Sequence, residues 1–133
     1  MIRSEFEISD MVVKDLDWRN GILDILKEGD HLLRRFGEVE VVTIEPQGSV
    51  QVFRQQADEI WALLSGHASF HLQDRRQDSP SQGAEVNLDI SQDSPQAVLI
   101  PFGVLSKVTS NQGATLVRIN THQDESFPGD EIP

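Results

Sequence analysis

Six side chains of the sequence carry groups that could bind or transform a small molecule: Arg54, Glu59, Trp61, Ser106, Arg118 and Asn120. Arg54 and Glu59 stand on two successive segments of alternating polar and apolar character, separated by the polar turn 55–58. Alternation puts every second residue of a strand on the same face, so both side chains are expected to point inward from neighbouring strands. Arg54 could then grip a carboxylate or phosphate through two parallel hydrogen bonds, or it could simply neutralise Glu59.

The other four residues leave two arrangements open. Trp61 shares a face with Glu59, where its ring could stack on a sugar or fill the core. Arg118 and Asn120 alternate along the last apolar segment. Turned inward, they would add hydrogen-bond donors beside Ser106. Turned outward, they are surface residues, and the pattern slightly favours this second arrangement.

Short alternating segments recur along the chain, and no long helical period interrupts them. Residues 38–45 are typical, with Val39 and Val41 on one face and Glu38, Glu40 and Ile44 on the other. Many short strands at regular spacing predict an antiparallel sandwich or barrel. The 133 residues predict one domain, 1–133. We expect an N-terminal edge strand in 1–16 and an acidic tail in 124–133.

Further strands are expected at 67–72, 84–90, 97–101 and 114–121, with a mobile loop around Asp78–Gly83. Gly66 is expected to close the strand that begins at Glu59. Glycine, proline and polar clusters between these segments mark the turns.

Composition excludes several classes of function. The chain carries 11 Lys and Arg against 22 Asp and Glu, a formal net charge of −11. A nucleic-acid partner is therefore not expected, because phosphate binding needs a basic face. No segment reaches the roughly 18 apolar residues of a membrane span, and the N-terminus has no apolar targeting segment. We expect a cytoplasmic protein without a membrane partner.

Two motifs resemble those of a known superfamily. The run ADEIWALLSG at 57–66 resembles the first motif of the cupins, and IPFGV at 100–104 resembles the Pro-x-Gly turn of their second motif. The resemblance implies an all-β fold, the cupin-type double-stranded β-helix or jelly-roll barrel.

The same resemblance argues against a metal. Metal-binding cupins place two histidines before the glutamate of the first motif and a third after the Pro-x-Gly turn. Val52, Arg54 and Ser106 occupy those positions, and only Glu59 matches. A divalent metal needs several imidazole or carboxylate ligands, which a valine, a permanently protonated guanidinium and a hydroxyl do not supply. We therefore expect no metal and no other cofactor.

Within the cupins, the layout resembles the small 3,5-epimerases and 3,4-ketoisomerases that act on thymidine-diphosphate sugars. The similarity rests on DWRNG at 17–21, LLSG at 63–66, HLQD at 71–74, IPFGV, and GATLVRINT at 113–121. In that branch the sugar nucleotide binds in the barrel mouth and histidines of the first motif act as bases. Val52 and Arg54 stand at those positions, and a guanidinium cannot act as a base near neutral pH. The family's mechanism is therefore not carried over.

Three functional hypotheses follow. The first, which we favour, is a metal-free cupin-like protein that binds a small anionic or sugar-like ligand in the barrel. The second is a nucleotide-sugar isomerase or epimerase whose base has moved to Glu59 or to a histidine from elsewhere. The third is a structural or regulatory dimer that pairs through an apolar outer face formed by Ile60, Ala62 and Leu64. A homodimer is expected under all three hypotheses.

Overall fold

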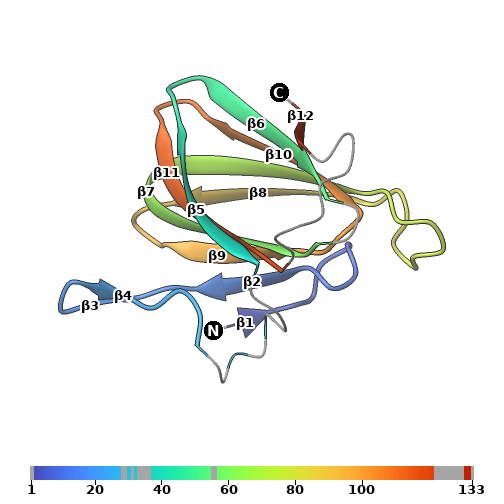
Figure 1. Cartoon of the computed structure of the whole chain (residues 1–133), viewed down its shortest axis with the longest axis horizontal. Helices are drawn as coiled ribbons and strands as arrows, with labels where there is room; N and C mark the ends of the chain where they lie inside the picture. The colour runs from blue at the N-terminus through green and yellow to red at the C-terminus, as the bar shows by residue number, and fades with distance from the viewer. Residues whose placement is uncertain are drawn as a thin grey trace.

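The computed structural model describes residues 2–27, 30, 32, 37–54 and 57–121, and the backbone of 131–132 (Figure 1). Its elements are all strands: β1 (Ile2–Arg3), β2 (Val12–Asp15), β3 (Trp18–Arg19), β4 (Ile22–Leu23), β5 (Glu38–Ile44), β6 (Gly48–Phe53), β7 (Glu59–Asp74), β8 (Glu85–Ser91), β9 (Gln96–Ile100), β10 (Val104–Ser110), β11 (Ala114–Asn120) and β12 (Glu131–Ile132). In this part of the chain no helix is long and apolar enough to cross a membrane.

The strands form two antiparallel sheets that share β7. The first sheet runs β1-β2-β9-β7-β11-β5, and the second runs β8-β7-β10-β6-β12. The small hairpin β3–β4 stands apart from both and projects beyond the sheets in Figure 1. This arrangement confirms the all-β class expected from the alternating pattern.

The strand β7 belongs to both sheets because it bends at Gly66. Residues 59–66 pair with β11, and residues 67–73 pair with β8. Gly66 has a φ of +88°, and a Cβ atom there would lie 2.2 Å from the carbonyl oxygen of Gly113. Only glycine tolerates both conditions. The sequence pattern predicted that Gly66 would close a strand, whereas the structure shows a bend within one strand of 16 residues.

The main core lies between the two sheets. The ring of Trp61 meets the ring of Phe70 edge to face, with 6.2 Å between their centroids. Apolar side chains from both sheets surround this pair, and burial of each stabilises the fold by about 1.5–3 kcal/mol. The buried members include Leu63, Leu72, Ile90, Val98, Val108 and Leu116.

A second core covers the outer face of the first sheet. Ile60 and Ala62 are buried there, and the half-buried side chains of Leu23, Ile25, Leu26 and Leu32 pack against this cluster. The chain's own segment thus covers most of the apolar face on which the expected dimer contact was based. Leu64 is half-buried. Dimerisation therefore stays a prediction, and the apolar face of Ile60 and Ala62 no longer supports it.

Three local expectations are corrected. The segment after the Pro-x-Gly turn forms β10, a strand that the pattern did not separate from its neighbours. The N-terminal region contains two short paired strands, β1 and β2, in place of one edge strand. The loop expected to be mobile at 78–83 is anchored, because Ser79 and Ser81 both donate hydrogen bonds to the buried carboxylate of Asp74. Apart from the backbone pairing of β12 with β6, the expected tail lies outside the described residues.

Candidate functional site

One end of the jelly roll gathers the polar side chains that point toward its interior. At this end β5 and β7 begin and β6, β9 and β11 end, so that Glu59 lies opposite Ile100 on one side and Asn120 on the other. We call it the Glu59 end. Its side chains come from strands of both sheets, which is why residues far apart in the sequence meet there.

Glu59 is the centre of the cluster and is only 2% exposed. Its Oε2 atom accepts a hydrogen bond from Arg54 Nε at 3.0 Å, and its Oε1 atom accepts one from Trp61 Nε1 at 3.1 Å. The Nε atom of Arg118 lies 3.9 Å from Oε2. Burial raises the pKa of Glu59 above its ordinary value, and the positive charges of Arg118 and Arg54 oppose that rise.

Arg118 points inward from β11, so the outward arrangement favoured by the sequence pattern is wrong. Strand β11 lies between β5 and β7, and its register sets Arg118 beside Trp61 and Glu40. The guanidinium carbon lies 5.5 Å from the centroid of the Trp61 ring, a cation–π distance. Two guanidinium nitrogens donate to Glu40 Oε1, at 3.1 Å from Nε and 2.5 Å from Nη2. The positive charge is thus buried against the face of Trp61 and near the carboxylates of Glu40 and Glu59.

Asn120 also points inward, and one of its atoms is unsatisfied. Its Nδ2 atom donates to Glu38 Oε1 at 3.1 Å. Because a carboxylate oxygen only accepts hydrogen bonds, this contact fixes which side of the amide carries the nitrogen. The Oδ1 atom is buried and finds no hydrogen-bond partner within the described residues. A buried acceptor left in this state costs roughly 1–3 kcal/mol.

Among the described residues, the space behind this cluster is narrow where Ser106 lies. Ser106 is 1% exposed and lines a pocket together with Val52, Arg54 and Glu59. That pocket is too tight to admit a water molecule.

Within the described residues, no group of three or more His, Cys, Asp or Glu side chains could hold a metal ion. The carboxylate of Glu59 is engaged by Arg54 and Trp61, and the Arg54 cation lies at hydrogen-bond distance from it. Val52, which occupies one of the cupin metal-ligand positions, offers no donor atom. No chemistry through a metal is therefore derived for this site.

All six residues named from the sequence meet at the Glu59 end. The sequence interpretation missed Glu38 and Glu40 as their partners. The signal was present in the alternation of β5, which puts both glutamates on the same face as the buried Ile44. The pattern identified that face, but it did not show that β11 would set Arg118 and Asn120 opposite the two carboxylates.

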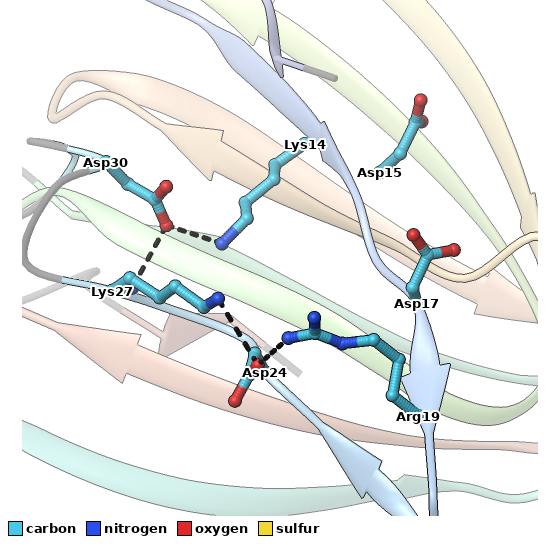
Figure 2. A pocket seen from close by; sticks show the side chains of 7 residues that line it. All are labelled: Lys14, Asp15, Asp17, Arg19, Asp24, Lys27 and Asp30. Carbon is cyan, nitrogen blue, oxygen red and sulfur yellow. Dashed lines mark hydrogen bonds and ion pairs between the residues drawn. The ribbon is translucent and has the colours of Figure 1, made fainter.

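A second, charged cleft lies on the outside of the molecule and measures about 280 Å³. Its lining residues are Lys14, Asp15, Asp17, Arg19, Asp24, Lys27 and Asp30 (Figure 2). Each of its cations has a carboxylate partner: Lys14 pairs with Asp30, and Arg19 and Lys27 pair with Asp24. Lys14 also donates to the carbonyl of Ile25 at 2.9 Å. These contacts tie segment 24–30 to β2.

Comparison with known proteins gives one curated relative and many structural neighbours. No protein-family model matches the chain. The spore coat polysaccharide biosynthesis protein SpsL of Bacillus subtilis (strain 168) is 30% identical over 95 residues, which is 70% of this chain and 62% of that protein. The matched region thus spans less than two thirds of the length of this relative.

The structural neighbours named here are enzymes of thymidine-diphosphate sugars. A dTDP sugar isomerase from Desulfovibrio desulfuricans G20 aligns with a TM-score of 0.82 and 16% identity, over 96% of this chain and 86% of that one. The 3,5-epimerase RmlC of Legionella pneumophila Philadelphia 1, solved with dTDP-4-keto-L-rhamnose, aligns with a TM-score of 0.79 and 16% identity, over 99% of this chain and 77% of that one. At these identities the likeness shows the fold. It confirms the all-β double-stranded β-helix, or jelly roll, that the sequence motifs predicted.

Proposed function

We propose, from the premise that this chain is a cupin-type jelly roll of the RmlC-like form, that it binds a sugar-like ligand of the nucleotide-sugar class over its Glu59 end, without a metal. The observation that carries the proposal is the buried polar cluster of Glu59, Arg118 and Asn120, which faces the interior at the end of the fold. If this end had only a structural role, apolar side chains would stabilise the fold at least as well, because buried ion pairs are often no more stabilising than well-packed hydrophobic side chains.

The comparisons support the ligand class. The structural neighbours named above act on thymidine-diphosphate sugars or were solved with one, and the curated relative is a polysaccharide biosynthesis protein. Binding without catalysis is favoured because each oxygen of Glu59 already accepts a hydrogen bond and its carboxylate is only 2% exposed. A general base has to reach the proton it removes.

The proposal predicts a thermal shift. Thymidine diphosphate glucose at about 100 times its Kd is expected to raise the melting temperature by a few degrees in a saturable manner, because a ligand that binds only the folded state stabilises it. Arg54→Met takes one hydrogen-bond donor from the buried carboxylate of Glu59 and so disturbs the cluster over which the ligand lies. The apparent affinity read from the titration should fall at least about tenfold. Arg3→Met is the control, because Arg3 is exposed in β1, the edge strand of the first sheet, which β2 and β9 separate from β7. Equal shifts in both variants would place any binding elsewhere.

A nucleotide-sugar epimerase or isomerase is the second candidate, and the pKa of Glu59 favours it. Burial raises that pKa, and a carboxylate whose pKa approaches the working pH is a better general base. On this hypothesis Glu59 removes a proton from a carbon next to a ketone, after the ligand displaces one of its partners.

Deuterium exchange separates the two candidates. On the enzymatic hypothesis, the protein in heavy water should catalyse exchange at the carbons beside the ketone of a thymidine-diphosphate 4-keto-6-deoxy sugar, and Glu59→Gln should lower the rate by about 100-fold or more. If the protein binds the 4-keto sugar and catalyses no exchange, the enzymatic candidate is rejected and the binding function stands.

A further inference from the structure

The hairpin β3–β4 carries an exposed tryptophan on a short, well-defined arm. Its turn residues Asn20 and Gly21 have φ values of +52° and +79°, the two positive values that the tight type I′ turn of a hairpin requires. Trp18 lies opposite Leu23, and directly opposed residues of an antiparallel pair point to the same side. Leu23 uses this side to pack against the outer core. Trp18 is 54% exposed, because the hairpin projects beyond the two sheets (Figure 1). The arm therefore presents Trp18 for a contact with a sheet face that its own chain does not complete.

A second exposed apolar surface lies on β5, at the edge of the first sheet. Val39 and Val41, which we call the valine pair, are 51% and 67% exposed. They lie opposite Ile119 and Val117 of β11, and these two residues belong to the outer core or pack against it. The valine pair therefore continues the apolar outer face of the first sheet beyond the part that Leu23 covers. Among the described residues, the arm and the valine pair together hold four of the six large apolar side chains that are exposed.

We propose that these two surfaces meet between two copies of the chain, so that Trp18 of each copy packs on the valine pair of the other. Within one chain Leu23 already packs on this outer face, so a second copy repeats between chains a contact that each chain makes with itself. Two such contacts related by a two-fold axis form a closed dimer, the commonest symmetry of homo-oligomers. Tryptophan is also among the residue types that contribute most to the binding energy of interfaces. The inference does not depend on the ligand of the proposed function.

The charge of the chain gives this dimer a characteristic dependence on salt. Each copy carries a formal net charge of −11, so two copies repel each other at low ionic strength, and salt screens that repulsion. The apolar contact itself does not rely on charge. The dissociation constant of the dimer should therefore fall as sodium chloride is raised from about 50 to about 500 mM. A dimer held by ion pairs would weaken over this range, and that result would contradict the apolar contact.

Sedimentation equilibrium of the full chain tests the interface. Wild type is expected to show twice the mass of one chain at about 50 µM, and Trp18→Ser should raise the dissociation constant about 30-fold or more. Phe102→Ser is the matched control, because Phe102 is also exposed. It follows the end of β9, whereas the hairpin follows Asp15, which pairs with Gln96 at the start of that strand. A wild type that stays monomeric at about 100 µM, or equal effects of the two variants, would overturn the inference.

A mixture of two variants tests whether Trp18 and the valine pair touch across the interface. Trp18→Ser and Val41→Ser each damage both contacts of their own dimer. In the mixed dimer one contact is intact, because one copy supplies its tryptophan and the other its valines. The dissociation constant of the mixed dimer should therefore lie about fivefold or more below the geometric mean for the two variants, beyond the statistical factor. Both side chains are exposed, so neither change removes a core contact. No gain on mixing would mean that the two residues do not meet, and the inference would fail.

Discussion

Replacement of Gly66 by alanine is expected to lower the free energy of unfolding by about 2–5 kcal/mol, the sum of a left-handed backbone penalty and a steric clash. The clash falls on backbone: the added Cβ would lie 2.2 Å from Gly113 O and 2.9 Å from the Cα of Ala114. A flexible side chain could move away, but these atoms belong to the turn that starts β11. Relief of the clash would shift that strand, and with it Arg118 and Asn120.

Urea unfolding measures this effect, and Gly83→Ala is its matched control. Gly83 has a φ of +86°, almost the same as the +88° of Gly66, but a Cβ there would meet nothing within 4 Å. The control should therefore show the backbone penalty alone, about 1–2 kcal/mol. The difference between the two variants isolates the close approach of β7 to the turn before β11. Equal losses would mean that β7 does not approach the turn before β11 closely at Gly66.

The fold could be predicted from the sequence because its signals are local. Alternation on one strand reports which face is buried, and the segments at 38–45 and 85–91 show it without any knowledge of their partners. The glycine at position 66 marks where β7 changes direction, but the sequence around it does not show why a glycine is required there. Its cause is the backbone of Gly113, which is distant in the sequence.

The site was harder to predict because it depends on register. Arg118 and Asn120 alternate with Val117 and Ile119, and either set could face the interior. The structure buries both sets: the polar pair lies against the carboxylates of β5, and Ile119 lies in the outer core under segment 23–32. A strand buried on both faces has no solvent side to serve as a reference, so alternation alone could not decide its orientation.

The second large effect is expected at Asp74, at the C-terminal end of β7. Its side chain is fully buried beside Arg76, with Arg76 Nη2 3.0 Å from Oδ2. The backbone N–H and Nε of Arg76 donate to Oδ1, and the hydroxyls of Ser79 and Ser81 donate to Oδ2. Arg76 also donates to the carbonyl of Ser9, which joins the loop to the N-terminal segment. Asp74→Asn should cost about 3–5 kcal/mol, because it leaves a largely buried guanidinium without its buried counter-ion. The remaining ion pair of Arg76, with Asp10, involves a carboxylate that is 77% exposed.

Asp74 should also make stability depend on pH in a defined direction. Burial alone would raise its pKa, but the hydrogen bonds from Arg76, Ser81 and Ser79 outweigh burial and hold the pKa far below the usual 3.8. The unfolded chain therefore binds a proton first as the pH falls, so the stabilisation is complete above about pH 4 and is lost progressively below it. The difference in unfolding free energy between wild type and Asp74→Asn should be constant from pH 7 to 5 and shrink toward pH 3. Asp89→Asn, at an exposed carboxylate that accepts from Ser69, should show a small difference at every pH. A difference at Asp74 that does not change with pH would show that its charge does not hold the loop.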